Sequence, residues 1–240
     1  MTRRALVTGG SGAIGAAICA RLGAAGAEVI VHANTQLARA EAVAAAIAEA
    51  GRKAHAIAFD VTDAAGTRAA LEAMVEQSPI DILVNNAGVH DDAAFAGMSL
   101  EQWSRVIAVS LDGFYHVTRP LVMPMVAARW GRIISVTSVA AQLGNRGQVN
   151  YAAAKGALHA ATRSLALELA SRGVTVNAVA PGIVESEMSA RTFDAEAIRR
   201  LVPMQRAGTP REIAEVVAFL ASEAAGYVTG QVIGVNGGMA

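Results

Sequence analysis

Residues 5–15 read Ala-Leu-Val-Thr-Gly-Gly-Ser-Gly-Ala-Ile-Gly, and this stretch decides the fold. An apolar run ends at Thr8, glycines follow, and apolar residues then recur at the helical spacing of Ile14, Ile18 and Leu22. Glycines allow a tight turn and let the backbone approach a phosphate, whose charge is stabilised at a helix N-terminus. A plain turn is the alternative, but a strand before the glycines and a helix after them favour nucleotide binding. The predicted contacts are Gly9, Ser11, Gly12, Ala13, Ile14 and Gly15.

The same alternation of strand and helix continues along the chain. Short runs of apolar and β-branched residues are separated by alanine-rich segments with helical spacing. The runs cover residues 5–8, 29–31, 56–59, 80–84, 132–137, 174–179 and 232–235. Near-continuous apolar strands that alternate with helices indicate a parallel sheet covered on both faces. We therefore predict a single α/β domain over residues 1–240, with a Rossmann fold whose doubly wound, seven-stranded parallel sheet carries helices on both faces.

Composition excludes several classes of protein. The 240 residues are 53% hydrophobic and carry 20 basic and 20 acidic side chains, so a sizeable core is expected and a nucleic-acid partner is not. The longest uncharged stretches are interrupted by polar residues, which argues against a membrane span. Cys19 is the one cysteine, so no internal disulfide can form, as is usual for a reducing compartment.

Two helix starts and one irregular stretch stand out. Ser99 with Gln102 forms a capping box, and Thr209-Pro210-Arg211-Glu212 combines an N-cap, a proline at the first helical position and a capping glutamate. Residues 183–208 show weak periodicity. Long irregular stretches in compact domains often cover an active site, so we predict a lid there, with a surface excursion as the alternative.

The ends of the second and third strands bear on the type of nucleotide. NAD-binding folds usually place an acidic residue after the second strand, where this chain has Ala33 and Asn34. A small neutral residue leaves room for a 2′-phosphate, which favours NADP, although no arginine lies beside it. Asp60 and Val61 follow the third strand and are predicted to contact the cofactor.

The decisive chemical signal is the pair Tyr151 and Lys155. Residues four apart share one helix face, so a phenol and an ammonium can converge on one point. The chain has 18 arginines but only two lysines, and a compact ammonium suits the tuning of a neighbouring pKa. The alternative is that Tyr151 and Lys155 are an ordinary solvated pair. Ser138, which lies at the end of a predicted strand 13 residues before Tyr151, argues against this alternative.

With these residues in place, the whole chain resembles the short-chain dehydrogenase/reductase family. Ser138, Tyr151 and Lys155 match its catalytic serine and Tyr-x-x-x-Lys, and residues 85–88 match its Asn-Asn-Ala-Gly motif. Asn177, Pro181 and Gly182 match the motif after its sixth strand. The resemblance implies a nucleotide-binding half at about 1–90 and a catalytic half at about 91–240. It also implies cofactor contacts at Asn86, Ala87, Gly88, Tyr151, Lys155, Pro181, Gly182, Ile183 and Val184.

Within that family the chain most resembles the β-ketoacyl-acyl-carrier-protein (3-oxoacyl) reductases, through residues 144–151, 221–231 and 235–239. This resemblance implies a cytoplasmic homotetramer that uses NADPH to reduce a 3-oxoacyl chain on an acyl carrier protein. The implied substrate contacts are Gln142, Asn145, Gln148 and Met188, and the implied carrier-docking residues are Arg129 and Arg172. The alternatives are a dehydrogenase for another ketone or secondary alcohol, and a nucleotide-binding regulator without catalysis.

Two departures from the family pattern affect these expectations. Ala13 stands at a position that is usually glycine, and Gly12 stands where NADP-binding relatives often carry arginine. Ser110 replaces the catalytic asparagine, whose backbone carbonyl in relatives holds a water of the proton relay, so serine is expected to substitute.

Two further expectations concern charge and metal. We expect Lys155, together with the oxidised nicotinamide, to lower the pKa of Tyr151. The histidines show no metal-ligand spacing, so no metal is expected. Residues 90–92, His-Asp-Asp, are predicted to form a loop at the mouth of the site, with a carboxylate-rich ligand cluster as the alternative.

Overall fold

The protein is described by a computed structural model that covers residues 2–186, 189 and 193–240. Seven parallel strands form one sheet in the order β3-β2-β1-β4-β5-β6-β7. The strands are β1 (Arg4–Val7), β2 (Glu28–Ala33), β3 (Ala54–Ala58), β4 (Ile82–Asn85), β5 (Gly131–Val136), β6 (Val174–Pro181) and β7 (Val232–Val235). Strand order reverses between β1 and β4, and doubly wound sheets bind ligands at such a reversal, beside the carboxyl ends of the strands.

Helices connect the strands. They are α1 (Ala13–Ala24), α2 (Leu37–Glu49), α3 (Ala64–Gln77), α4 (Leu100–Ile107), α5 (Gly113–Ala128), α6 (Ala140–Leu143), α7 (Val149–Leu169), α9 (Ala195–Leu201) and α10 (Pro210–Ala221). Short turns of other helix types are η1 (Phe95–Gly97), η2 (Ala108–Asp112), η3 (Ala170–Arg172) and η4 (Glu223–Ala225), of which η2 is a π-helix.

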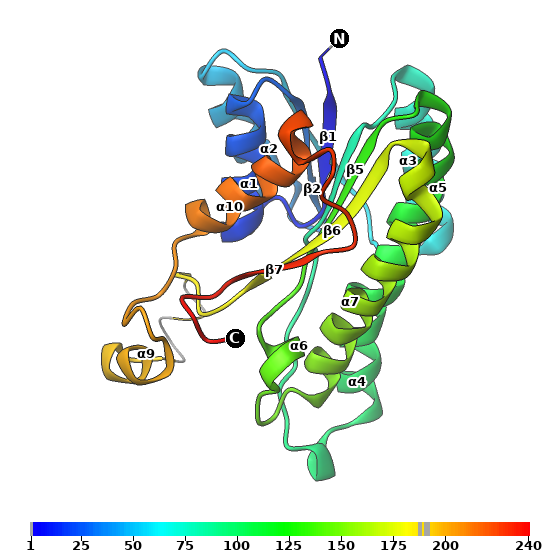
Figure 1. The fold of residues 1–240 in the computed structure, drawn as a ribbon. Coiled ribbons are helices and arrows are strands. Elements are labelled where there is room, and N and C mark those ends of the chain that lie inside the picture. Colours follow the sequence, from blue (N-terminus) through cyan, green and yellow to red (C-terminus); the bar gives the residue numbers. More distant parts are fainter. Residues whose placement is uncertain (1, 187–188, 190–192) are drawn as a thin grey trace.

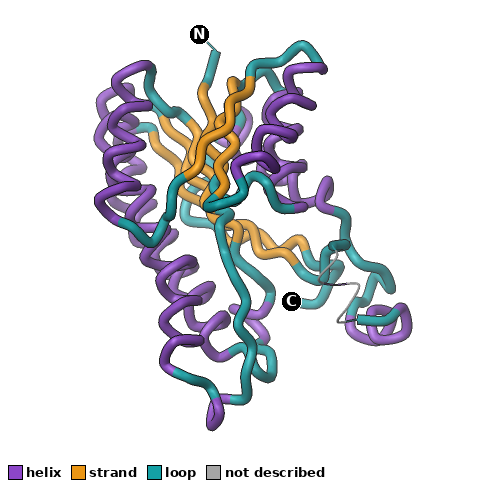
Figure 2. The backbone as a smooth tube through the Cα atoms, turned by 180° about the vertical axis from the view of Figure 1, so that it is seen from behind, coloured by secondary structure: helices purple, strands orange, loops and turns teal. Residues whose placement is uncertain are grey.

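The sheet separates two apolar cores. Figure 1 shows α1, α2 and α10 on one face and α3, α5 and α7 on the other, with α4 beyond the lower end of α5. The first core includes Ile18, Val31 and Ile213, and the second includes Leu83 and Leu121, all fully buried. Seen from behind, the strands run through the middle of the molecule between these two layers (Figure 2). The predicted fold is thus confirmed, with strand ends displaced by at most two residues.

Both predicted capping boxes are present. Ser99 Oγ accepts a hydrogen bond from the Gln102 backbone N–H, and the Gln102 side chain accepts one from the Ser99 N–H. Thr209 and Glu212 make the equivalent pair at the start of α10, where Pro210 is the first helical residue. The two capping boxes fix where α4 and α10 begin, because their side chains accept hydrogen bonds from N-terminal backbone N–H groups that have no partner within the helix.

The two ends of the irregular stretch 183–208 lie side by side. Val184 and Gly208 form a parallel bridge, and between them lies α9, which projects away from the sheet in Figure 1. Met188 lies outside the described residues, so its predicted substrate contact stays a prediction, as does the lid. Within the described part of the chain, none of the helices combines the length and the apolar character that crossing a membrane requires.

Candidate active site

The glycine-rich turn after β1 is held in shape by Asn86, which follows β4. Asn86 Nδ2 donates to the carbonyl oxygens of Thr8 and Gly9 at 2.9 and 3.0 Å, and Thr8 Oγ1 accepts from the Asn86 and Ala87 backbone N–H groups. Gly9 adopts a left-handed φ of 62°, which favours glycine. A Cβ at Gly15 would overlap the Gly9 carbonyl oxygen, so close packing of α1 against the turn requires glycine there.

The N-terminus of α1 fits a phosphate group. Gly12 is its N-cap and supplies no side-chain cap, so the first-turn N–H groups remain available to an anion. Ser11, Gly12, Ala13 and Ile14 are exposed or half-buried, whereas Gly15 is buried. A Cβ at Gly12 would have only an ordinary contact of 3.5 Å, so this side of the turn is open. The predicted nucleotide contacts therefore surround an accessible helix N-terminus.

His32, on β2, supports this turn and was not among the predicted site residues. The Gly9 N–H donates to His32 Nδ1 at 3.1 Å, so Nε2 must carry the proton that bonds the Phe59 carbonyl oxygen at 2.8 Å. Burial lowers the pKa of His32, which keeps the ring neutral. A histidine directly after the apolar run of residues 29–31 was the available signal in the sequence.

The residues predicted to select the cofactor lie at the carboxyl ends of β2 and β3. Ala33 is the last residue of β2 and is buried, while Asn34 is exposed beside it. Asp60 Oδ1 accepts hydrogen bonds from the Thr62 N–H and hydroxyl, both at 2.8 Å, and Val61 is buried. The described tip of β2 therefore carries no acidic side chain, as the sequence indicates.

The catalytic candidates meet where β5 ends and α7 begins. Ser138 follows β5 by two residues, and its Oγ accepts a hydrogen bond from the Ala140 N–H at 3.1 Å. Tyr151 and Lys155 lie on successive turns of α7, with Lys155 Nζ 5.7 Å from the centre of the Tyr151 ring. The Lys155 ammonium donates to the Val136 carbonyl oxygen at 2.9 Å. The structure thus brings the three predicted residues together at the strand ends.

Burial dominates the acid–base properties of this group. It raises the pKa of Tyr151 to about 12, against a hydrogen bond to Ser138 that lowers it, and it lowers the pKa of Lys155 to about 8. In the protein by itself the pKa of Tyr151 is therefore raised. The lowering that was expected from Lys155 together with the oxidised nicotinamide stays a prediction. At neutral pH the phenol keeps its proton and the ammonium keeps its charge, which is the state that can donate a proton to a carbonyl oxygen.

Ser110 lies in the π-helix η2, between α4 and α5. Such insertions often mark functional sites. Its hydroxyl and Asn85 Oδ1 are buried, line one small cavity and have no hydrogen-bond partner in the described part of the chain. Ser110 therefore places a buried hydroxyl at the position where the family that the sequence resembles has asparagine.

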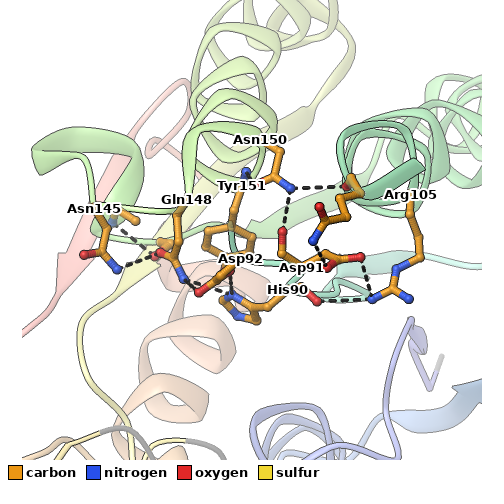
Figure 3. Close-up of polar contacts among 11 residues, drawn as sticks. His90, Asp91, Asp92, Arg105, Asn145, Gln148, Asn150 and Tyr151 are labelled. Carbon is orange, nitrogen blue, oxygen red and sulfur yellow. Dashed lines mark hydrogen bonds and ion pairs between the residues drawn. The ribbon is translucent and has the colours of Figure 1, made fainter. Parts of the chain in front are cut away.

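The loop after β4 is joined to the start of α7 by side-chain amides (Figure 3). Gln148 Nε2 donates to Asp92 Oδ2 at 2.8 Å, and its Oε1 accepts from Asn145 Nδ2 at 3.0 Å. His90 stacks on the Tyr151 ring with centroids 4.1 Å apart. The predicted loop thus borders Tyr151. The Gln148 amide donates to this loop through Asp92, and Asn145 donates to Gln148. Gln142 is exposed on α6.

The remaining predicted positions divide between the two ends of the sheet. Pro181 ends β6, and Gly182, Ile183 and Val184 follow it at the same end of the sheet as Tyr151. A Cβ at Gly182 would lie 2.8 Å from Asn236 Cα. Arg129 and Arg172 lie at the opposite end, and Arg129 Nη2 donates to the Ser171 carbonyl oxygen at 3.4 Å. Among the described residues, no three His, Cys, Asp or Glu side chains gather closely enough to hold a metal ion.

The chain is similar over nearly its whole length to one protein family and to several known proteins. A family model described as enoyl-(acyl carrier protein) reductase matches residues 9–240. The chain is 44% identical over 241 residues to 3-oxoacyl-[acyl-carrier-protein] reductase FabG of Aggregatibacter actinomycetemcomitans, which covers 100% of both chains. It is 46% identical to nodulation protein G of Rhizobium meliloti, over 99% of this chain and 97% of the relative. A solved structure of a putative gluconate dehydrogenase from Agrobacterium tumefaciens superposes with a TM-score of 0.95 at 32% identity, over 99% of this chain and 95% of that one.

Proposed function

The chain belongs to the short-chain dehydrogenase/reductase family, and from this premise we propose that it reduces a 3-oxoacyl thioester on an acyl carrier protein to the 3-hydroxyacyl thioester. The convergence of Ser138, Tyr151 and Lys155 carries this proposal, because the three supply a carbonyl-binding hydroxyl, an acid and a cation. Whole-length relatives named 3-oxoacyl-acyl-carrier-protein reductases support the choice of substrate.

In the proposed mechanism, Ser138 Oγ donates a hydrogen bond to the substrate ketone oxygen. Tyr151 Oη donates its proton to the same oxygen while a hydride adds to the ketone carbon. The resulting phenolate is stabilised by the Lys155 ammonium, whose position is fixed by the Val136 carbonyl oxygen. Ser110 is proposed to keep the place of the family's asparagine in the relay that returns a proton to Tyr151.

NADPH is the proposed cofactor, and its nicotinamide would supply the hydride. The N-terminus of α1 with the turn at Gly9–Gly15 would hold the pyrophosphate, and Lys155 the nicotinamide ribose. Ala33 and Asn34 leave the end of β2 without an acidic group, which favours a 2′-phosphate over the free ribose hydroxyl of NAD. Asp60, Val61, Asn86, Gly88 and residues 181–184 border the same end of the sheet and are proposed to complete the cofactor site.

We further propose a cytoplasmic homotetramer. Tyr115 and Met123 on α5 are 58% and 68% exposed, and Leu167 on α7 is 85% exposed, so both helices present apolar side chains to a partner. Arg129 and Arg172, the proposed carrier-docking residues, lie beyond the far end of α7 from Tyr151. That helix has 21 residues and is therefore about 30 Å long. A carrier docked there would serve the active site of a neighbouring subunit.

Nicotinamide absorbance tests the proposal directly. NADPH oxidation is followed with a 3-oxoacyl chain on carrier protein, with the same chain on a small thioester, and with simple ketones, and NADP⁺ reduction is followed with secondary alcohols. We expect the carrier-bound thioester to give the highest kcat/KM and Tyr151→Phe to abolish the reaction. Activity on simple ketones alone would overturn the substrate assignment and leave the mechanism intact.

A second candidate is a dehydrogenase for another ketone or secondary alcohol. The likeness to a putative gluconate dehydrogenase favours it, since the two chains share one fold over nearly their whole lengths. NADP⁺ reduction with sugar acids, in the same assay, distinguishes this candidate from the first.

A further inference from the structure

His90 makes a direct contact with the catalytic tyrosine. Its imidazole stacks on the Tyr151 ring with an interplanar angle of 27° and centroids 4.1 Å apart. His90 belongs to the loop that follows β4, and Tyr151 to the first turn of α7, so the stack joins the two halves of the site (Figure 3). Tyr151 is only 8% exposed, and the imidazole covers one face of its ring.

Hydrogen bonds define which form of the imidazole makes this stack. Gln148 Nε2 donates one hydrogen to Asp92 Oδ2, and its other hydrogen faces His90 Nδ1 at 3.3 Å. The reversed amide would place Gln148 Oε1 against Asp92 Oδ2, an acceptor against an acceptor, so Nε2 is the atom that faces Asp92 and His90. Nδ1 is therefore an acceptor, and the stacked imidazole is neutral with its proton on Nε2.

Protonation of His90 would disrupt this arrangement. A proton on Nδ1 would oppose the Gln148 N–H and face Asp92 Oδ1, which lies 3.9 Å away. The imidazolium would then be drawn toward Asp92, and the contact with Gln148 would be lost. Since a third of the His90 side chain is exposed, the ring can exchange protons with solvent.

The charges around His90 come from three elements. Asp92 lies on its own loop, and Lys155 lies on α7 with the neutral phenol of Tyr151. Arg105, on α4, pairs with Asp91 at 3.2 Å and donates to the His90 carbonyl oxygen at 3.4 Å. Burial lowers the pKa of His90 and Lys155 lowers it further, while Asp92 raises it. The neutral stack is thus complete at pH 7 and is lost as the pH falls through this lowered pKa.

We propose that His90 is a positioning residue for Tyr151, and that protonation of His90 sets the acid limit of the reaction. The stack holds the Tyr151 ring from one face and so would fix the direction in which its hydroxyl is presented to a substrate, and only the neutral imidazole keeps the bond to Gln148. The role in turnover rests on the proposed reductase function, whereas the coupling of the two rings does not.

Kinetics of three variants test the role in turnover. His90→Ala should lower kcat at least tenfold at pH 8 with the KM for NADPH unchanged, because the phenol loses its support but the cofactor site does not. His90→Phe keeps an aromatic ring without a titrating group, so it should recover most of that loss. The ratio of its kcat to that of the wild type should rise as the pH falls from 7 to 5. Asp92→Asn should move the acid limit to lower pH, since it removes the charge that favours imidazolium.

Two kinetic outcomes would overturn the proposal. One is an unchanged kcat in His90→Ala at pH 8. The other is an acid limit that persists unaltered in His90→Phe.

A spectroscopic test needs no turnover. The chain has three tyrosines, so ¹³C-labelled tyrosine gives a simple NMR spectrum in which Tyr151→Phe assigns the Tyr151 ring. We expect the Tyr151 ring signals to shift between pH 7 and 5 in the wild type and to stay constant in His90→Phe. Constant signals in the wild type would refute the coupling. A normal shift in a protein that reduces no ketone would instead refute the reductase function.

Discussion

At the residue scale, burial acts in opposite directions on Tyr151 and Lys155. An apolar environment disfavours the charged form of each group, so the pKa of the phenol rises to about 12 and that of the ammonium falls to about 8. Both groups nevertheless hold a proton at neutral pH. A reductase requires this combination, because the phenol must give up a proton and the ammonium must stabilise the phenolate that remains.

Tyr151→Phe should retain cofactor binding and lower kcat at least a thousandfold. Phenylalanine keeps the ring, and therefore the stack on His90, but removes the hydroxyl that is proposed to protonate the substrate oxygen. NADPH fluorescence gives the dissociation constant and absorbance gives kcat. Retention of a tenth of the wild-type kcat would contradict the role of Tyr151 as proton donor.

The low pKa of Lys155 predicts an alkaline limit. As the pH rises through about 8 the ammonium becomes neutral, and kcat/KM for NADPH, which reports the free enzyme, should fall above that value. Lys155→Arg is the matched control, because a guanidinium stays charged over this range. Its kcat/KM should be lower overall but flat from pH 7 to 10. A wild-type profile without an alkaline limb would show that the charge of Lys155 is not required.

At the element scale, the unit formed by β1, the glycine-rich turn and α1 depends on close approach at one position. A Cβ at Gly15 would overlap the Gly9 carbonyl oxygen and come within 2.8 Å of Asn86 Nδ2, whereas a Cβ at Gly12 would meet nothing closer than 3.5 Å. The two glycines belong to one sequence motif but carry different constraints, because one faces the turn and the other faces outward.

Gly15→Ala and Gly12→Ala form a matched pair that tests this difference. Overpacking at Gly15 should cost about 1–3 kcal/mol and weaken NADPH binding at least tenfold, since the turn must shift. Gly12→Ala should change the dissociation constant less than threefold. Thermal unfolding and NADPH fluorescence measure both effects, and equal losses in the two variants would contradict the described packing.

At the scale of the whole molecule, the proposed docking surface and the site lie at opposite ends of the sheet. Arg129 follows α5 and Arg172 ends η3, both beside the amino ends of β5 and β6, whereas Tyr151 lies beside the carboxyl ends. In the proposed arrangement, a carrier docked on one subunit would deliver its substrate to the site of another. Docking and subunit assembly can be tested separately.

Charge reversal at both Arg129 and Arg172 should raise the KM for a carrier-bound substrate at least tenfold and leave the KM for a small thioester unchanged. An acidic carrier is then repelled, while the catalytic groups are untouched. Reversal at Arg52 and Arg211, which are exposed elsewhere, changes the net charge equally and serves as the control. Equal effects on both substrates would refute the docking role.

Leu167→Glu should disrupt the proposed tetramer. A charge on this exposed leucine would be buried without a partner if α7 packs against another subunit. Light scattering on the wild type should give four times the 24.6 kDa of the chain, and the variant should give a smaller species. A wild-type monomer would overturn the assembly.

The sequence by itself determined the features that depend on neighbours along the chain. The strand, turn and helix over residues 5–22, the capping boxes at Ser99 and Thr209, and the shared helix face of Tyr151 and Lys155 all follow from local spacing. The parallel sheet also followed, because alternating apolar strands and helices leave little choice of architecture. Nucleotide binding and the catalytic roles of Ser138, Tyr151 and Lys155 stay predictions, and they rest on chemistry that requires fixed residue types at fixed offsets.

Only the tertiary structure decided the contacts between distant segments. The bond from the Gly9 N–H to His32 Nδ1, the stack of His90 on Tyr151 and the bond from Gln148 Nε2 to Asp92 Oδ2 join residues from separate elements. Burial also raises the pKa of Tyr151 in the protein by itself, while the lowering expected from Lys155 together with the oxidised nicotinamide stays a prediction. The pKa of a side chain depends on how much water and charge surround it, and these are set by the packing of elements that are far apart in the sequence.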